Sequence, residues 1–352
     1  MRTILGSRKH DYLMKLSIFL VTAALLAATA GCPGGYNPPP SQNLEIRTWY
    51  DLDAVRNNLA GHHTLMNDLN STTPGYEQLA SPAANEGKGW EPIGFIDLRY
   101  GYAGPGPFGG TFDGQGYDIC DLYINRPDES YVGLFGVVYQ DGVLKNIGVV
   151  NVTVSGNHSV GGLLGSNAAT VSNCYSSGEV SGDEYIGGLA GLIIVNGAVS
   201  YSYSTSNVTG KLQVGGLAGR DTGVVSNSYS TGSVTGMGDV GGLVGYAYGN
   251  PAVSDSYSIG NVSGYEHTGG LVGWNEGDTT VVSDSFWDTE TSGQATSAGG
   301  TGKNTTEMQD IATFSGATWN ITAVANSSTR DPAYIWNIVN NVTYPFLSWQ
   351  AI

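Results

Sequence analysis

The sequence predicts an all-β protein: a right-handed parallel β-helix with a small N-terminal helical cap and a C-terminal closing element. A phrase of the form V-G-G-L-x-G recurs along the chain, and successive copies begin 28, 26, 28, 26 and 28 residues apart. A second phrase, S-x-x-Y-S-x-x-x-V-x-G, follows most copies. A period of this length is typical of solenoids, whereas a propeller blade needs roughly 40 residues. The copies begin at Val132 (shortened to V-G-L-F-G), Val160, Ile186, Val214, Val240 and Thr268.

The composition agrees with a strand-rich, exported protein. The chain has 352 residues, of which 53 are Gly and 12% are charged, and its net charge is -16. Gly favours turns over helices. A basic face is what nucleic acid requires, so we expect no nucleic-acid partner. No His and Cys cluster has metal-ligand spacing, so neither a metal nor another cofactor is predicted.

Residues 1–32 are predicted to be an export signal, in which basic residues precede an apolar run that is short for a membrane-spanning helix. The run ends in T-A-G-C, which resembles a lipoprotein lipobox, so Cys32 is the candidate for lipidation and membrane anchoring. Thr29 departs from that pattern, which leaves ordinary signal cleavage open. Residues 33–43, rich in Pro and Gly, form a tether.

The rest of the chain divides into three predicted regions. Residues 44–109 form the N-terminal cap and first strands, with a helix that Thr48 caps with Asp51 three residues later. Residues 110–292 form the β-helix, in which equivalent valines such as Val180 and Val208 point inward and stack at about 4.8 Å. Residues 293–352 form a C-terminal capping region that closes the bottom of the stack, with a strand pair between Tyr334 and Trp349.

The two phrases together resemble the GLUG motif of bacterial and archaeal cell-surface proteins, over about residues 130 to 292. The segments G-T-F-D-G-Q-G-Y before the array and S-F-W-D-T-E-T-S-G after it also resemble common borders of such arrays. The resemblance implies a location in the cell envelope and a structural or adhesive role. It implies no defined reaction. Lipidation of Cys32 would anchor the chain to the membrane on its outer side.

The candidate ligand contacts lie in the loops that vary in length. These loops begin at Leu192, Tyr246 and Trp274, all in the same arm of the coil. Variable loops on one side of a regular stack often carry binding function, although slippage at an exposed corner would look the same. Large apolar residues at a corner suggest a contact surface, and Tyr246, Tyr248 and Trp274 are therefore candidates.

An aromatic ladder is the second candidate surface. Tyr175, Tyr203, Tyr229 and Tyr257 share one position of the repeat, with Phe286 after them and Ile147 before them. Outward rings could stack on sugars, and inward rings would be core. A turn at Asn173 or Asn227 would reverse the alternation, so the sequence leaves both orientations open.

The alternative to a binding scaffold is a carbohydrate-active β-helix, a polysaccharide hydrolase or lyase. Asp255 and Asp284 would lie on adjacent rungs about 5 Å apart, a separation that suits retaining glycoside hydrolysis. Repetition alone also produces such pairs, and no third catalytic group is fixed beside them. The leading prediction is a non-enzymatic, envelope-anchored scaffold that binds a surface glycan or protein.

The sequence supports two further predictions. Asn207 and Asn261 recur two coils apart in N-x-S/T sequons at an outward position, which makes them glycosylation candidates. Cys120 and Cys174 lie two coils apart, beyond disulfide reach if they share a column, so we expect buried ladder residues.

Overall fold

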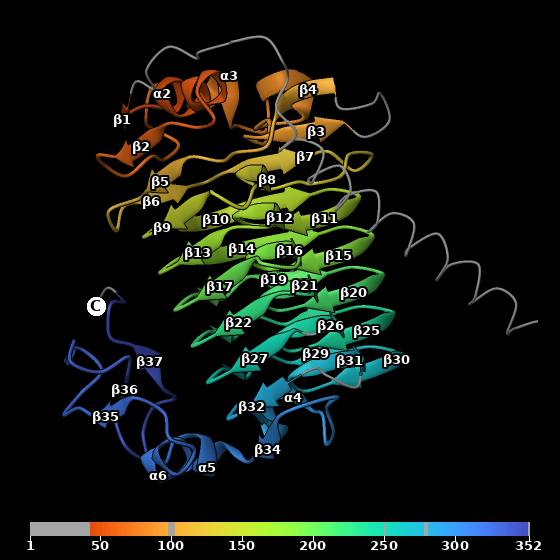
Figure 1. Ribbon diagram of the computed structural model, residues 1–352, viewed down its shortest axis with the longest axis vertical. Helices are drawn as coiled ribbons and strands as arrows, with labels where there is room; N and C mark the ends of the chain where they lie inside the picture. Colours follow the sequence, from red (N-terminus) through yellow and green to blue (C-terminus); the bar gives the residue numbers. More distant parts are fainter. Residues whose placement is uncertain (1–42, 98–102, 250, 278–280, 351–352) are drawn as a thin grey trace, which may run out of the picture. The chain divides into compact units, whose positions relative to one another are not determined.

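The chain forms a parallel β-solenoid, which confirms the predicted fold class (Figure 1). The computed structural model describes residues 43–97, 103–249, 251–277 and 281–350. Each regular coil contributes strands to four sheets, which we number in chain order within a coil. Sheet 1 consists of β1 (Leu44–Ile46), β2 (His62–Leu65), β5 (Thr111–Asp113), β9 (Val143–Lys145), β13 (Thr170–Ser172), β17 (Ala198–Ser200), β22 (Val224–Ser226), β27 (Ala252–Ser254) and β32 (Val281–Ser283).

In the other three sheets, too, equivalent strands of successive coils pair in parallel. Sheet 2 consists of β6 (Asp118–Cys120), β7 (Tyr123–Asn125), β10 (Gly148–Ser155), β14 (Tyr175–Ser181), β18 (Tyr203–Ser204), β19 (Asn207–Thr209), β23 (Tyr229–Ser230), β24 (Val234–Thr235), β28 (Tyr257–Ser258), β29 (Val262–Ser263), β33 (Phe286–Asp288) and β34 (Thr301–Lys303). Sheet 3 consists of β11 (His158–Gly161), β15 (Glu184–Gly187), β20 (Leu212–Gly215), β25 (Gly238–Gly241) and β30 (Glu266–Gly269). Sheet 4 consists of β8 (Phe135–Val138), β12 (Leu164–Asn167), β16 (Ala190–Ile193), β21 (Ala218–Asp221), β26 (Val244–Tyr248) and β31 (Val272–Glu276).

The repeats pair in register, as their spacing predicts. Val160 pairs with Ile186, Ile186 with Val214, and Val214 with Val240, all in parallel. The valines of the second phrase are buried and line the interior. Asn207 and Asn261, which directly precede two of these valines, are exposed. Similar apolar side chains therefore stack along the array and form its core.

The last Gly of V-G-G-L-x-G is required by close packing between sheets 3 and 4. A Cβ added to Gly219 would lie 2.3 Å from the backbone nitrogen of Ile186, which belongs to the preceding coil. Gly245 shows the same relation to Val214, at 2.5 Å. A side chain at either position would force the two sheets apart, which explains why the repeat keeps glycine there.

A ladder of buried serines explains the second phrase. The residue before each serine has a left-handed backbone, for example Asn227 with φ of 46°. The Oγ of Ser228 accepts from the backbone nitrogen of Ser202 at 3.2 Å and donates to the carbonyl of Ser226 at 2.8 Å. Ser202 and Ser256 repeat this arrangement. Each serine therefore satisfies buried backbone groups at a turn and ties two coils together.

Parallel pairing begins before the predicted range of 110–292, in the N-terminal part of the chain. β1 pairs with β2 and β2 with β5, so these two N-terminal strands already belong to sheet 1. Helix α2 (Trp49–Ala54) begins after Thr48, which forms the predicted capping box with Asp51. The other N-terminal elements are a 3₁₀ turn (Val55–Asn57), α3 (Tyr76–Leu79), a second 3₁₀ turn (Ala84–Gly87) and the antiparallel pair β3 (Phe95–Asp97) and β4 (Ala103–Gly106).

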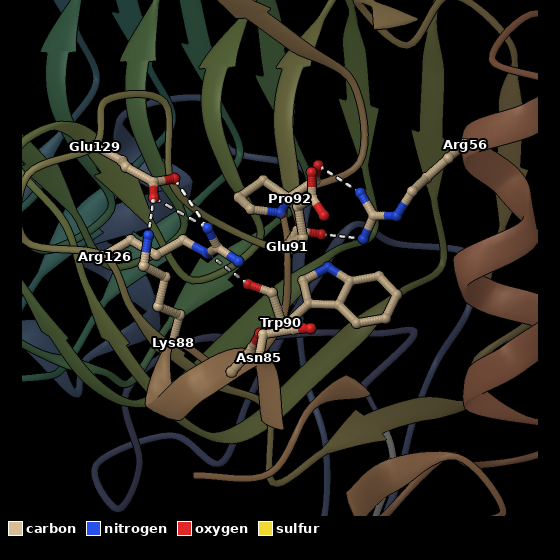
Figure 2. Close-up of polar contacts among 9 residues, drawn as sticks. Arg56, Asn85, Lys88, Trp90, Glu91, Pro92, Arg126 and Glu129 are labelled. Carbon is tan, nitrogen blue, oxygen red and sulfur yellow. Dashed lines mark hydrogen bonds and ion pairs between the residues drawn. The ribbon is translucent and has the colours of Figure 1, made fainter. Parts of the chain in front are cut away.

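Two arginines bind the loop that contains Trp90 (Figure 2). Arg56 donates to the carbonyl of Pro92 at 2.7 Å and lies 4.8 Å from the Trp90 ring centroid. Arg126 donates to the carbonyl of Trp90 at 3.0 Å and pairs with Glu129 at 3.0 Å. Both guanidinium groups are directed at backbone of the same chain, so this network stabilises the cap.

The C-terminal region packs against the side of the stack, not against its bottom as predicted. Trp336 and Trp319 pack on Tyr257, whose hydroxyl donates to the carbonyl of Pro345 at 2.5 Å. These residues form a second apolar cluster, separate from the solenoid core. The region consists of α4 (Thr289–Ser292), α5 (Thr305–Met308), α6 (Ile311–Gly316), β35 (Ile321–Ala323), β36 (Trp336–Ile338) and β37 (Phe346–Leu347), with β36 and β37 antiparallel.

The lower end of the stack is covered by a different segment. The backbone nitrogen of Gly270 donates to the carbonyl of Thr296 at 3.0 Å, and that of Ala298 donates to Val272 at 2.9 Å. Ser297 accepts from the nitrogen of Val272 at 2.8 Å. The segment after α4 therefore pairs with backbone groups that the last coil would otherwise leave open.

Cys174 is buried, but Cys120 is only half-buried and pairs with Val150, three positions along from the column of Cys174. The two cysteines therefore do not share a column, and the expectation of a buried ladder residue was wrong for Cys120. Both thiols are free. In the part of the chain that the structure describes, no helix has the length and apolarity needed to cross a membrane. Cys32 and the rest of residues 1–42 lie outside that part.

Candidate functional site

The aromatic ladder forms in register and faces away from the solenoid core. Tyr175, Tyr203, Tyr229 and Tyr257 stack with ring centroids 4.9 Å apart and interplanar angles of 9°, 4° and 4°. Gly148, and not Ile147, occupies the rung above Tyr175, because β10 pairs Gly148 with that tyrosine. In each coil, the residue two positions before the aromatic ring, such as Asn173 or Asn227, has a left-handed backbone. This conformation reverses the strand alternation and turns the ring outward.

The C-terminal region covers this ladder. Tyr229 and Tyr257 are 6% and 2% exposed, and Trp349 lies 5.9 Å from Tyr203. Because the rings stack face to face, the inner rings present edges rather than faces to whatever lies over them. Ligand contact at Tyr229 or Tyr257 would require the C-terminal region to leave, and the faces needed for sugar stacking are already used by neighbouring rings.

Asp255 and Asp284 do lie on adjacent rungs, because the strands beside them pair Ser254 with Ser283. Burial, and then the neighbouring carboxylate of Asp284, raise the pKa of Asp255. Trp319 of the C-terminal region donates to the backbone carbonyl of Asp284 at 2.7 Å. Among the described residues, no basic side chain forms an ion pair with either carboxylate, so the arrangement adds no third catalytic group to the pair.

Asn207 and Asn261 are exposed at the outer face of sheet 2, each directly before a buried valine, Val208 or Val262. The amide of Asn207 donates to Glu179 at 2.9 Å, and its carbonyl accepts from the backbone nitrogen of Ser233 at 3.1 Å. Asn207 is thus held in a polar ladder on the surface. The exposure of both residues is compatible with their role as glycosylation candidates.

The candidate contacts Tyr246, Tyr248 and Trp274 lie in strands β26 and β31 of sheet 4, not in loops as predicted. They lie together with polar groups from several coils. Tyr246 and Tyr248 stack with centroids 6.1 Å apart, and Tyr246 pairs with Trp274 across β26 and β31. Tyr246 is 7% exposed and its hydroxyl donates to Glu276, whereas Trp274 is 38% exposed. We call this group the Arg220 cluster. Its members are Tyr185, Gln213, Arg220, Asp239, Tyr246, Tyr248, His267, Trp274 and Glu276.

Arg220 is the buried centre of the cluster. Its guanidinium carbon lies 5.1 Å from the ring of Tyr246, 5.3 Å from that of Tyr248 and 5.5 Å from that of Tyr185. The side chain is 3% exposed. A cation among three aromatic rings is attracted by each ring, and the interaction strengthens where water is excluded. Arg220 therefore holds aromatic residues from the two coils on either side of its own in one arrangement.

The lower end of the cluster is more polar and more exposed. His267 stacks on Trp274 with centroids 3.9 Å apart, and its Nδ1 lies 2.8 Å from Asp239. Burial raises the pKa of Asp239, and the hydrogen bond with His267 opposes that shift. Gln213 is 4% exposed, and its Oε1 has no hydrogen-bond partner among the described residues. The cluster thus combines aromatic surface with carboxylate, imidazole and amide groups.

Sequence reasoning found three members of this cluster and missed the others. Tyr185, Gln213, Asp239 and His267 all directly precede the residue that begins V-G-G-L-x-G, and each has a left-handed backbone. The chemistry of that repeated position changes from coil to coil, while the residue after it is Ile, Val or Thr. This contrast was the available signal. Arg220 gave a second signal, since basic residues are rare in this array.

The GLUG motif family matches residues 156–181 and 238–263. The chain carries GLUG motifs. A protein named halomucin, from Haloquadratum walsbyi, is 34% identical over 153 residues, which are 42% of this chain and 2% of halomucin. A protein named as a Gly-rich membrane protein, from Evansella cellulosilytica, is 37% identical over 133 residues, which are 36% of this chain and 14% of that protein. The chain therefore spans only a small part of the length of both relatives.

A solved structure shares the fold. It is a Bacteroides ovatus protein described as a candidate immunoglobulin A1 protease, with a TM-score of 0.61 and 19% sequence identity. The similarity covers 90% of this chain and 94% of the other. At this identity the similarity concerns the fold alone, because one scaffold supports unrelated functions.

Proposed function

We propose that the chain is a non-enzymatic scaffold of the cell envelope that binds a surface ligand, a glycan or a protein, through the Arg220 cluster. The GLUG motifs support a repeat protein of this kind, and the relatives' names, halomucin and a membrane protein, support a location at the cell surface. The acidic net charge of -16 suits an exported protein that does not bind nucleic acid.

The observation that carries the proposal is the convergence of four aromatic rings and several charged groups on one part of the stack. Apart from the tyrosine ladder, which the C-terminal region covers, the other outward positions of the array are mostly Ser, Thr, Asn, Ala and Val. Trp274 remains 38% exposed although large apolar residues favour burial. Aromatic residues and Arg are also the residues that contribute most often to binding energy at interfaces.

The test is a binding screen with a matched control. The mature chain is applied to an array of glycans and extracellular proteins, together with the double variant Tyr248→Ala/Trp274→Ala and the control variant Tyr334→Ala. Tyr334 is 40% exposed, close to the value for Trp274, but belongs to the C-terminal region. We expect the double variant to lose binding and the control to keep it. Absence of any bound partner, or equal binding by all three proteins, would refute the proposal.

A further inference from the structure

We propose that the lower end of the Arg220 cluster is a subsite for a neutral saccharide, in which Trp274 supports the sugar ring and Asp239 and Glu276 accept its hydroxyl hydrogens. This inference rests on the proposed function and names the chemical class of its ligand. Three features carry it: a fixed aromatic platform, anchored carboxylates, and a buried amide carbonyl without a partner.

Trp274 is both exposed and held in place. Its ring is supported on one side by His267 at 3.9 Å, and His267 is held in turn by Asp239 at 2.8 Å. An amphipathic ring of this kind contacts the apolar face of a pyranose and leaves the sugar hydroxyls free for polar groups. Because the Trp274 ring is already ordered, binding loses little side-chain entropy.

Two carboxylates are oriented beside this platform. Asp239 binds His267 through Oδ1, and Glu276 accepts from the hydroxyl of Tyr246 through Oε2. An ionised carboxylate has roughly four acceptor positions, so each group keeps capacity for further donors. Sugar hydroxyls on neighbouring carbons are such donors, and fixed acceptors discriminate among them by position.

Gln213 adds a third acceptor in the same cluster. Its side chain is only 4% exposed, and its Oε1 has no hydrogen-bond partner among the described residues. Native proteins rarely leave a buried polar atom unpaired, so such an atom requires an explanation. Gln213 shares its position in the repeat with Asp239 and His267, one coil from Asp239 and two coils from His267. A ligand hydroxyl would supply the missing donor.

Charge favours a neutral ligand over an acidic one. The chain has a net charge of -16, and Asp239 and Glu276 would repel sulfate or uronate groups. Arg220 is the cation of the cluster, but it is buried among three rings rather than exposed beside Trp274. We therefore expect unsubstituted hexose oligomers to bind better than acidic polysaccharides.

The experiment titrates the mature chain with neutral hexose oligomers and with uronate oligomers, by calorimetry. We expect binding of neutral oligomers that changes little between roughly 50 and 500 mM salt. Trp274→Ala should weaken it at least tenfold, Trp274→Phe should retain most of it, and Asp239→Asn should weaken it several-fold. Tyr334→Ala is the control, and the melting temperature of each variant shows whether it remains folded.

Three results would overturn the inference. One is a preference for uronate oligomers with strong salt dependence, and another is unchanged binding of neutral oligomers by Trp274→Ala. The third is binding of proteins alone through the Arg220 cluster, which would refute the saccharide subsite but leave the proposed function standing. Absence of both glycan and protein binding would refute both proposals.

Discussion

Asp221 is a buried carboxyl at a position where asparagine occurs two coils earlier. Asn167 accepts from the backbone nitrogen of Ala169 at 2.9 Å and donates to the carbonyl of Ala198 at 3.2 Å. Asp221 likewise accepts from the backbone nitrogen of Gly223 at 2.8 Å. Its Oδ2, however, has no hydrogen-bond partner among the described residues. Burial raises the pKa of Asp221 to about 7. A protonated Asp221 can donate where Asn167 donates, whereas an ionised one cannot.

We predict that Asp221→Asn stabilises the protein at pH 8 and has little effect at pH 4. The raised pKa means that the folded state retains a proton that the unfolded state loses between about pH 4 and pH 7. The contribution of Asp221 to stability is therefore complete at acidic pH and is lost as the pH rises to about 7. The shift corresponds to a gain for the variant of up to roughly 4 kcal/mol.

Urea unfolding of both proteins at pH 4, 6 and 8 measures this difference. A gain of equal size at all three pH values would show that ionisation of Asp221 is not the cause. Asn167→Asp is the reciprocal variant, and it should introduce the same pH dependence two coils higher in the stack.

At the scale of elements, the contact between sheets 3 and 4 decides what the repeat tolerates. We predict that Gly219→Ala costs at least roughly 3 kcal/mol of unfolding free energy, because its Cβ would lie 2.3 Å from backbone that cannot move without separating two sheets. Gly316→Ala is the control, since a Cβ there meets nothing within 4 Å and the residue lies in helix α6. Thermal melting compares them, and a small effect of Gly219→Ala would show that the sheets can separate.

The C-terminal region is a second packing unit, held by the tyrosine ladder. Trp336 is fully buried and its ring centroid lies 5.8 Å from that of Tyr257. We predict that Trp336→Ala costs roughly 3–5 kcal/mol locally and speeds hydrogen exchange in β35, β36 and β37. Sheet 1 should remain protected, because its core is a separate cluster. Equal loss of protection in both would show that the two clusters unfold together.

At the scale of the whole molecule, the solenoid offers one long surface and one predicted attachment point. We predict that Cys32→Ser releases the mature protein from the membrane fraction, because a thiol at the end of the signal is the lipid attachment site of lipoproteins. Fractionation and immunoblotting measure the release, with Cys120→Ser as the control. Unchanged membrane association of Cys32→Ser would contradict a lipid anchor.

The sequence by itself determined the solenoid, its register and its inward residues. A repeat of 26 or 28 residues places Val180, Val208 and Val234 at equivalent points, and parallel strands then stack them without further information. The glycines of the first phrase were visible as repeated letters, and so was the buried serine position, which is Ser in four copies and Cys174 in another. The reasons for them became apparent only in three dimensions. The serine satisfies a backbone nitrogen, and a Cβ added to Gly219 would lie 2.3 Å from backbone of the neighbouring sheet.

The tertiary structure alone decided which surfaces are covered and which residues meet. The sequence could not orient the tyrosine ladder, because a left-handed residue reverses strand alternation and an Asn or Asp does not announce that conformation. Nor could it place the C-terminal region, whose contacts with Tyr229 and Tyr257 do not repeat. The Arg220 cluster joins residues from four coils, among them Tyr185 and Trp274. Repetition specifies neighbours along one column, whereas contacts between columns depend on how the coil bends.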